Sequence, residues 1–229
     1  DHDKSSIKIL TQKNRDTIAG LPTILGIVLL IDKISGEIVS IMDGEYITAL
    51  RTGAASGLAT RLLSREDSCK LAIFGCGSQG RLQLAAVDAV RRLEKIWVFD
   101  RSERQAQQFV EEMTPESEAA IVFTNDLSVL KDVDIICTAT NAEAPLFNND
   151  HLKKGCHINA IGSYKPTMQE IDPDIVRSAR VYFDEQESCM KTSGDILKAF
   201  PDPRINPKNL IGEIGELVLD KIRGRSNSE

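Results

Sequence analysis

The chain has 229 residues, enough for one large core or two smaller ones, because domains usually hold about 100–200 residues. Its composition, 41% hydrophobic and 27% charged, is typical of a soluble globular protein. The net charge of −6, without any run of Lys and Arg, argues against a nucleic-acid partner. The longest apolar run, Ile24–Ile31, is too short for a bilayer, which takes about 20 apolar residues, so no membrane partner is expected.

Residues 1–70 predict a strand pair followed by a helix. Ile24–Ile31 and Glu37–Met42 have the apolar character of two strands, and the turn between them, Asp32–Gly36, ends in a glycine with a permissive backbone. Glu45–Ser64 is rich in Ala and Leu and predicts one long helix that enters the following domain.

From Leu71 to Asn159, short apolar runs alternate with segments of helical spacing. This alternation predicts an α/β fold of the Rossmann type, a doubly wound parallel sheet with helices on both faces. The predicted strands are Leu71–Phe74, Ile96–Phe99, Ala120–Phe123, Val133–Cys137 and Cys156–Ala160, and the predicted helices are Ser78–Arg92 and a second one that Ser102 caps and that runs through Met113.

The remaining segments are shorter. Phe200–Pro207 contains prolines and predicts a loop, Ile211–Ile222 predicts a short amphipathic helix, and Gly224–Glu229 is a polar tail. Five cysteines are scattered along the chain without a CxxC pair, which predicts free thiols and a cytoplasmic protein. Three histidines without HxxxH spacing predict no metal site.

The segment Gly75–Gly80 matches the pattern GxGxxG, follows a predicted strand and opens a predicted helix. In that context Gly75 permits the tight turn, Gly77 lets the backbone approach a pyrophosphate, and Gly80 lets helix and strand pack closely. The helix N-terminus offers N–H groups and a partial positive charge to the phosphates. The motif therefore predicts a dinucleotide site.

Asp100 lies at the end of the second predicted strand, where an acidic residue accepts hydrogen bonds from the ribose hydroxyls. Its charge would repel a 2′-phosphate, which favours NAD(H). The neighbouring Arg101 could pair with that phosphate, so NADP(H) stays open as the second cofactor.

Several motifs resemble the ornithine cyclodeaminase/mu-crystallin family over nearly the whole chain. The run Thr48–Ala55, with Arg51-Thr52 ahead of the nucleotide fold, makes this resemblance far more specific than the glycines alone. The other matching segments are Leu21–Thr23, Met42–Gly44, Ile158–Gly162 followed by Glu170, Gly212–Glu216 and Gly224–Ser226.

The resemblance implies hydride exchange between a nicotinamide and the α-carbon of a small amino, imino or oxo acid. It also implies a homodimer, and it divides the chain into three segments. Residues 1–50 form a substrate and dimerisation segment, 51–205 an NAD(P)-binding Rossmann domain, and 206–229 a C-terminal return segment, the chain ends together making a smaller α+β domain. Family members extend further at both ends, so we expect the chain to be truncated there.

The resemblance also assigns residues. Lys8 matches the substrate lysine, and Arg51 matches the arginine shared by the substrate carboxylate and the cofactor. Without the resemblance, Lys8 would be interpreted as an exposed strand-edge lysine and Arg51 as the partner of a surface acid. The positions that match cofactor contacts or the loop beside the nicotinamide are Thr23, Ser78, Gln79, Asp100, Thr138, Ile161 and Gly162.

Two positions in one loop depart from the cyclodeaminases. Tyr164 stands where they have a catalytic aspartate, and Met168 replaces the lysine that accompanies it. A phenol with an ordinary pKa of about 10 is a poor substitute for a carboxylate near neutral pH. We therefore expect a reductase or dehydrogenase in which Tyr164 is at most a proton donor. Loop packing of Tyr164, an ornithine cyclodeaminase, and a non-catalytic binding protein like mu-crystallin stay open as alternatives.

Overall fold

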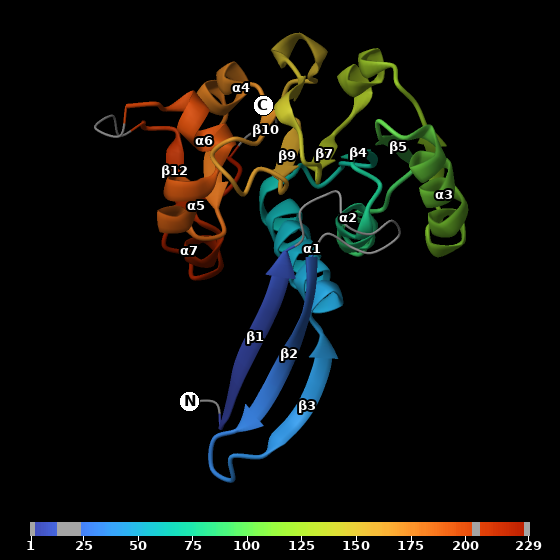
Figure 1. The fold of residues 1–229 in the computed structure, drawn as a ribbon. Helices are drawn as coiled ribbons and strands as arrows, with labels where there is room; N and C mark the ends of the chain where they lie inside the picture. Colours follow the sequence, from blue (N-terminus) through green and yellow to red (C-terminus); the bar gives the residue numbers. More distant parts are fainter. Residues whose placement is uncertain (1–2, 13–23, 203–206, 227–229) are drawn as a thin grey trace. The chain divides into compact units, whose positions relative to one another are not determined.

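The computed structural model describes residues 3–12, 24–202 and 207–226, which form two compact units, Asp1–Thr52 and Gly53–Glu229. The boundary falls inside helix α1 (Gly44–Leu63), which ends the first unit and begins the second (Figure 1). None of the helices within the described ranges combines the length and apolarity that a bilayer crossing requires. The roles expected of segments 1–50, 51–205 and 206–229 stay predictions.

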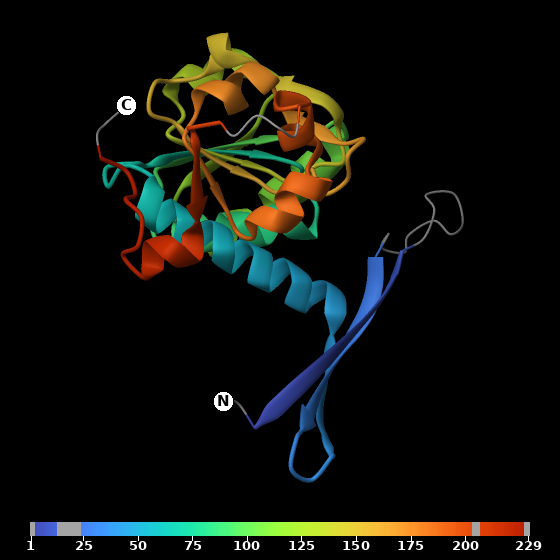
Figure 2. The ribbon, with the colours of Figure 1, turned by 90° about the vertical axis from the view of Figure 1, so that its left-hand side faces the viewer.

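The first unit holds an antiparallel sheet in the order β1-β2-β3, made of β1 (Lys4–Gln12), β2 (Ile24–Asp32) and β3 (Ile38–Asp43) (Figure 2). The predicted strand pair is confirmed as β2 and β3, with Gly36 at φ +76° in the turn. The structure adds β1, which pairs with β2 along its whole length. The predicted long helix is confirmed as α1.

One face of this sheet is apolar and exposed. The register places Ile7 opposite Leu29 and Leu29 opposite Ile41, so these three side chains share a face. Ile9 and Ile27 pair two residues further along the same face. Leu29 is half-buried, and the exposed fractions of the four isoleucines run from 40% for Ile27 to 68% for Ile41. Contiguous apolar side chains at a surface are typical of a protein contact site.

The second unit is built on a parallel sheet in the order β6-β5-β4-β7-β9. The chain leaves β4 for β5 and β6 on one side and returns to β7 and β9 on the other, so the strand order reverses between β4 and β7. This confirms the predicted Rossmann-type sheet. Its strands are β4 (Lys70–Phe74), β5 (Lys95–Phe99), β6 (Ala120–Phe123), β7 (Ile135–Thr138) and β9 (His157–Ala160).

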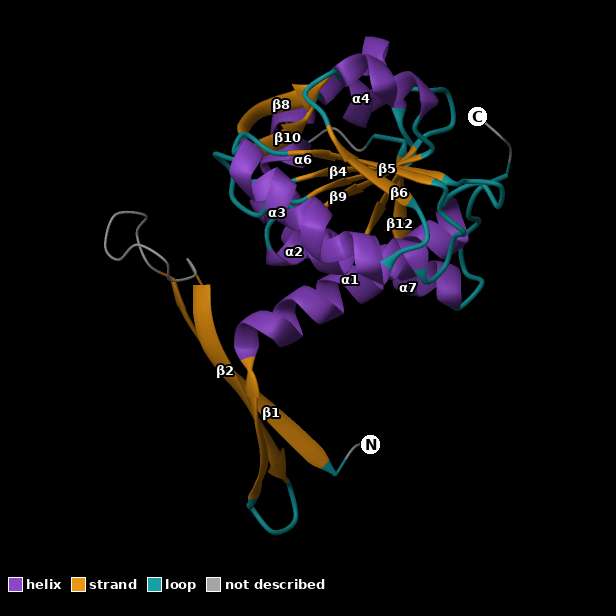
Figure 3. Ribbon diagram, turned by 90° about the vertical axis from the view of Figure 1, so that its right-hand side faces the viewer, coloured by secondary structure: helices purple, strands orange, loops and turns teal. Residues whose placement is uncertain are grey.

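Helices cover both faces of the sheet, as the alternating strands predicted (Figure 3). On one face, Leu71, Ile73 and Ile96 pack with side chains of α2 (Ser78–Asp88) and α3 (Glu103–Met113). On the other, the alternate residues of the strands pack with side chains from the 3₁₀ turn η2 (Leu127–Asp132), α4 (Pro173–Ser178) and α6 (Gly194–Ala199). Ser102 caps α3 by accepting from the N–H of Gln105, as predicted.

Smaller elements surround this sheet. Strand β8 pairs in parallel with β10, and β11 pairs in parallel with β12. They are β8 (Glu143–Phe147), β10 (Gln169–Ile171), β11 (Val181–Phe183), α5 (Gln186–Thr192), β12 (Leu210–Glu213) and α7 (Ile214–Val218), with 3₁₀ turns η1 (Thr114–Glu116) and η3 (Asn149–His151).

Two predicted helices were too long. Ile211–Ile222 is wrong as one helix, because β12 pairs with β11 before α7 begins, with a Glu213–Glu216 capping box at its start. Ser78–Arg92 is too long because α2 ends at Asp88, which frees Arg91 to bond elsewhere. The predicted loop Phe200–Pro207 and tail Gly224–Glu229 lie partly outside the described residues.

Arg91 binds the C-terminal end of α1. Its guanidinium donates to the carbonyl oxygens of Thr60, Arg61 and Ser64. Arg225 donates to the carbonyl of Leu63 in the same turn. Cations at a helix C-terminus satisfy its last carbonyls and favour its dipole.

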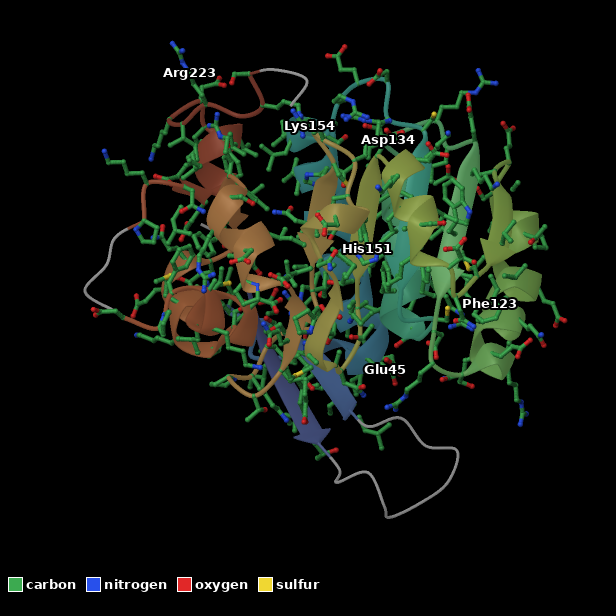
Figure 4. The ribbon with its side chains drawn as sticks, turned by 90° about the horizontal axis from the view of Figure 1, so that it is seen from above. Glu45, Phe123, Asp134, His151, Lys154 and Arg223 are labelled. Carbon is green, nitrogen blue, oxygen red and sulfur yellow. The ribbon has the colours of Figure 1, made fainter. Side chains whose placement is uncertain are left out.

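The amino edge of the sheet, where the strands begin, holds a buried acid. Asp134 precedes β7, and its carboxylate pairs with Arg65 and, at 2.6 Å, with Lys153. Its second oxygen accepts from the N–H groups of Cys69 and Lys70 at 3.1 and 3.2 Å. Figure 4 shows Asp134 at this edge and Phe123, the last residue of β6, at the opposite one.

His157, the first residue of β9, lies buried at the same amino edge. Its Nε2 donates to Asn159 Oδ1 at 3.1 Å, and Asn159 Nδ2 donates to Thr60 Oγ1 of α1 at 2.9 Å. Burial first, and then the charges of Arg225 and Arg91, lower the pKa of His157 to about 4. The imidazole is therefore neutral at physiological pH, and Asn159, to which it is bonded, joins β9 to α1.

Candidate functional site

The glycine turn lies at the carboxyl edge of the sheet, between the ends of β4 and β7. Gly75 has φ +99°, its N–H donates to the carbonyl of Phe99, and a Cβ there would lie 2.5 Å from the Ala139 carbonyl oxygen. A Cβ at Gly80 would lie 2.1 Å from the carbonyl oxygen of Gly75. Both positions therefore require glycine, one for backbone conformation and one for close packing.

Gly77 differs from its two neighbours in the motif. A Cβ built there would meet no heavy atom of the described residues within 4 Å, so these residues leave the space above Gly77 open. Gly77 is also the N-cap of α2 and supplies no side-chain hydrogen bond to it. An open approach to a helix N-terminus suits a pyrophosphate, which needs close contact with backbone N–H groups.

Ser78 and Gln79, two of the predicted cofactor contacts, are the first residues of α2. Ser78 is exposed. Within the described part of the chain, the buried Oε1 of Gln79 has no hydrogen-bond partner. Buried polar atoms are normally paired, so an unpaired amide oxygen beside the turn suits a site that takes a polar ligand.

Asp100 follows β5 and is hydrogen-bonded to the glycine turn. Its Oδ2 accepts from the N–H of Cys76 at 2.9 Å, and its Oδ1 accepts from the N–H of Ser102 at 2.8 Å. The carboxylate is thus fixed between the turn and the start of α3, with lone pairs left for ribose hydroxyls. Arg101 beside it is exposed.

Arg81 supports the turn and was missed by the sequence reasoning. Its guanidinium donates to the carbonyl of Cys76 at 2.6 Å, pairs with Glu112, and lies 5.4 Å from the ring centroid of Phe109. The signal for it is its position directly after Gly80, as the fourth residue of α2.

The ends of β7 and β9 meet around Glu170, a fully buried acid on β10. Thr138 is also fully buried, and its hydroxyl donates to Glu170 Oε2 at 2.7 Å. The N–H of Gly162 donates to the same oxygen at 2.7 Å, and the N–H of Thr140 donates to Oε1 at 2.6 Å. Ile161 donates its N–H to the carbonyl of Thr138 at 2.9 Å.

Tyr164 lies on the loop after β9 and is half exposed. Its N–H donates to the carbonyl of Gly162 at 3.1 Å, and Lys165 Nζ lies 5.4 Å from its ring centroid. Met168, which stands where the cyclodeaminases have a lysine, is buried. The loop thus presents a phenol to solvent and a thioether to the core.

Lys8 and Arg51 belong to the first unit. Lys8 Nζ donates to Thr48 Oγ1 on α1, one helical turn before Arg51. Partial burial of the ammonium, and then the charge of Arg51, lower the pKa of Lys8. Two cations this close suit an anionic group such as a carboxylate. Thr23, a predicted cofactor contact, lies outside the described residues.

The structure thus gathers the predicted residues into two groups. Gly75, Gly77, Ser78, Gln79, Gly80, Asp100, Arg101, Thr138, Ile161 and Gly162 lie at the carboxyl edge of the sheet, with Tyr164 on the loop that follows β9, while Lys8 and Arg51 lie in the first unit. Their roles stay predictions. Over the ranges that the structure describes, no cluster of His, Cys, Asp or Glu could hold a metal ion.

Comparison with known proteins identifies the family. The family model described as "Ornithine cyclodeaminase/mu-crystallin family" matches residues 1–229. The chain belongs to the ornithine cyclodeaminase/mu-crystallin family. The motifs around Arg51, the glycine turn and Gly162 therefore belong to a shared fold and not to a chance match of short patterns.

Three similar proteins illustrate the likeness. The Delta(1)-pyrroline-2-carboxylate reductase of Bacillus thuringiensis subsp. konkukian is 35% identical over 225 residues, 97% of this chain and 69% of the relative. The structure of Thermococcus litoralis Delta(1)-pyrroline-2-carboxylate reductase in complex with NADH and L-proline has a TM-score of 0.91 at 34% identity, covering 98% of this chain and 70% of that one. An archaeal alanine dehydrogenase dimer with bound NAD has a TM-score of 0.87 at 28% identity, covering 99% and 70%.

Proposed function

We propose that the protein is an NAD(H)-dependent reductase of a small imino acid, either cyclic, as in pyrroline-2-carboxylate, or open, as formed from pyruvate and ammonia. The observation that carries this is the glycine turn at the strand reversal, with Asp100 bonded to it through the N–H of Cys76. The reductases and the alanine dehydrogenase named above support the C–N bond as the one acted upon.

The residues of the turn fit a dinucleotide. The open space above Gly77 and the N-terminus of α2 would take the pyrophosphate, and Asp100 would take the adenosine ribose. NADH supplies the hydride when bound. NAD(H) is preferred because Asp100 repels a 2′-phosphate, and Arg101 keeps NADP(H) as the second choice.

Lys8 and Arg51 would bind the substrate. The Arg51 guanidinium can hold a carboxylate by two parallel hydrogen bonds, and the Lys8 ammonium can polarise an imine nitrogen or an oxo group. Reduction of an imine places a hydride on carbon and a proton on nitrogen. The Lys8 ammonium, whose pKa is lowered, can donate that proton, and Tyr164 is the alternative donor.

The test is NADH oxidation, followed by absorbance, with pyrroline-2-carboxylate and separately with pyruvate plus ammonia. Lys8→Ala is expected to lower turnover by a factor of about 100 or more and to leave the NADH Kd unchanged, because general acid catalysis contributes about 10²–10⁴. Lys33→Ala, an exposed lysine in the β2–β3 turn, is the matched control. Normal turnover in Lys8→Ala would reject the assignment of Lys8.

Two other outcomes would replace the proposal. Ammonia release from ornithine without net NADH oxidation would identify a cyclodeaminase, against which Tyr164 argues because a half-exposed phenol stands where the carboxylate is needed. Tight NADH binding without turnover of any imino or oxo acid would identify a binding protein.

We also propose a homodimer that pairs through the apolar face of the β1-β2-β3 sheet. Ile7, Ile9, Ile27 and Ile41 are each at least 40% exposed on that face, and the archaeal relative is a dimer. Ile41→Lys should shift the mass measured by light scattering from dimer towards monomer, while Lys33→Ala should not. We further propose a cytoplasmic location, which all five cysteines as free thiols support.

A further inference from the structure

Glu170 links three segments that the chain brings together from far apart. Its carboxylate accepts from Thr138, at the end of β7, and from Thr140, 30 positions before it in the chain. It also accepts from Gly162, on the loop after β9. Strands β7 and β9 are neighbours in the sheet, so one side chain ties together the two loops that leave their carboxyl ends.

These loops lie on the half of the sheet opposite Asp100. In a doubly wound dinucleotide fold each half of the sheet takes one mononucleotide, and the glycine turn and acid of β4 and β5 define the adenosine half. The ends of β7 and β9 therefore belong to the nicotinamide half. Glu170 lies behind that half, buried away from solvent.

The partners of Glu170 are neutral donors. Among the residues that the structure describes, no Lys or Arg forms an ion pair with it. Burial raises the pKa of Glu170, against the hydrogen bonds from Thr140 and Thr138. Burying a carboxylate costs free energy of desolvation. Both oxygens of Glu170 accept hydrogen bonds from backbone and hydroxyl donors, which offset part of that cost and hold the donors in place.

A second buried acid fixes the strand that carries Glu170. Asp195 Oδ1 accepts from the N–H groups of Glu170 and Ile171 at 2.8 and 3.1 Å. Its own N–H donates to Ser163 Oγ at 3.0 Å. The main chain of β10 is thus anchored independently of the Glu170 side chain, so a change in that side chain need not displace the strand.

Gly162 shows how tightly this point is packed. A Cβ there would lie 2.2 Å from the carbonyl oxygen of Thr140 and 2.5 Å from Glu170 Oε1. The two loops therefore touch through backbone atoms, with the carboxylate of Glu170 as the third partner. At this point the two loops are held by backbone contact and by their hydrogen bonds to Glu170.

We propose that Glu170 is a positioning residue that holds the loops after β7 and β9 in the conformation that receives the nicotinamide half of the cofactor. The effect expected on turnover rests on the proposed function. The effect expected on the conformation of the two loops does not. It assigns no contact between Glu170 and substrate.

The variant Glu170→Gln tests this, because it should break the hydrogen bond from Thr140 and keep those from Thr138 and Gly162. A glutamine has one acceptor oxygen, and the arrangement that keeps most bonds turns it towards Thr138 and Gly162. The amide NH₂ then faces the N–H of Thr140, which loses its acceptor. Hydrogen exchange at the Thr140 amide should accelerate about tenfold, the size of one lost hydrogen bond, while exchange at Gly162 stays near its wild-type rate.

Comparing ADP-ribose with NADH tests the adenosine and nicotinamide halves of the cofactor site separately. In Glu170→Gln the Kd for ADP-ribose should stay within about twofold, and kcat/KM for NADH should fall about tenfold or more, since a misplaced group costs rate. Asp195→Asn is the matched control. It also exchanges a buried acid for an amide, but Asp195 Oδ2 has no partner within the described residues, so one oxygen is enough to keep both bonds.

A milder variant covers the case in which Glu170→Gln fails to fold. Thr138→Val removes one donor and keeps the side-chain shape, and it should lower kcat/KM for NADH about threefold to fivefold. Wild-type exchange at Thr140 in Glu170→Gln would overturn the inference, and so would an equal loss of ADP-ribose and NADH binding. If the wild type reduces neither imine, the proposed function fails, while exchange at Thr140 still decides the role of Glu170.

Discussion

The two edges of the parallel sheet each bury one acid, and they use it differently. At the amino edge, Asp134 pairs with two cations, Arg65 and Lys153, as well as two backbone N–H groups. At the carboxyl edge, the donors that the described residues offer to Glu170 are all neutral. Burial raises the pKa of both carboxyls, yet the bonds from Lys153 and Cys69 leave Asp134 with a lowered pKa while that of Glu170 is raised.

This difference indicates two roles: the ion pairs of Asp134 stabilise the fold, whereas the hydrogen bonds of Glu170 fix the conformation of two loops. Ion pairs at the amino edge fix the start of β7 in a single, charge-compensated arrangement, which suits a part of the fold far from any ligand. At the carboxyl edge, Glu170 instead orders two backbone N–H groups and a hydroxyl without an ion pair among the described residues. The N-terminus of α2 then offers the positive potential for an anionic cofactor there.

Breaking the amino edge should have the largest effect on stability. Asp134→Asn removes the charge that compensates Arg65 and Lys153, and loss of one partner in a buried pair costs about 3–5 kcal/mol. We expect the melting temperature to fall by about 10 °C, at 2–4 °C for each kcal/mol. Asp132→Asn, an exposed neighbour, should change it little.

Ligand binding by Asp134→Asn tests whether the amino edge takes part in the nucleotide site. The Kd of Asp134→Asn for ADP-ribose, measured below its melting temperature, should equal the wild-type value, because Asp134 lies at the edge opposite the glycine turn. A weakened Kd in the folded variant would contradict the division of roles between the edges.

The next largest effect concerns His157 and pH. Its folded pKa of about 4 lies below the ordinary 6.5, so the unfolded chain takes up a proton first as the pH falls. Stability should be unaffected above pH 6.5 and decline by about 3 kcal/mol between pH 6.5 and 4, at 1.36 kcal/mol per pKa unit.

Urea unfolding of the wild type and His157→Gln at several pH values isolates this contribution, since the carboxyl groups are common to both. The glutamine keeps a donor for Asn159 Oδ1 and does not titrate. Its stability should fall less steeply below pH 6.5. Parallel curves for the two proteins would show that His157 is not the group responsible.

A smaller effect is expected from Gly77→Ala at the carboxyl edge. The new Cβ meets no atom of the described residues within 4 Å, so the melting temperature should change little. It occupies the open space above the turn, and the Kd for NADH should rise about tenfold, or 1.4 kcal/mol. An unchanged Kd, measured by fluorescence titration, would place the pyrophosphate elsewhere.

The smallest effect should come from Arg101→Ala. An exposed arginine contributes modestly to binding a phosphate, so the Kd for NADPH should rise about threefold while that for NADH stays constant. Titration with both cofactors checks this. Equal changes for the two would show that Arg101 does not read the 2′-phosphate.

Much of the fold could be predicted because buried parallel strands appear as short apolar runs, and β4 and β5 follow this pattern within a residue or so. The segment Ile211–Ile222 could not be predicted correctly. Its periodicity resembles a helix, but pairing with β11, a partner distant in sequence, makes its first residues a strand. Local pattern carries no information about such a partner.

The site was predicted unevenly for the same reason. The glycine turn and Asp100 are local signals with fixed spacing, whereas Lys8 and Arg51 rested on family resemblance. Glu170 was matched only as part of a family segment, and its role gave no signal, because two of the three donors that the described residues offer it are backbone N–H groups distant in the chain. Such a role becomes visible only when the strands are placed side by side.

The contact at Gly162 also limits how the substrate range could be redesigned. Any side chain at this position would collide with the Thr140 carbonyl, so a mutant library that varies residue 162 should yield mostly inactive members. Tyr164, two residues on and half exposed, can change without touching that contact. A directed-evolution campaign towards bulkier imines would therefore diversify position 164 and leave 162 fixed.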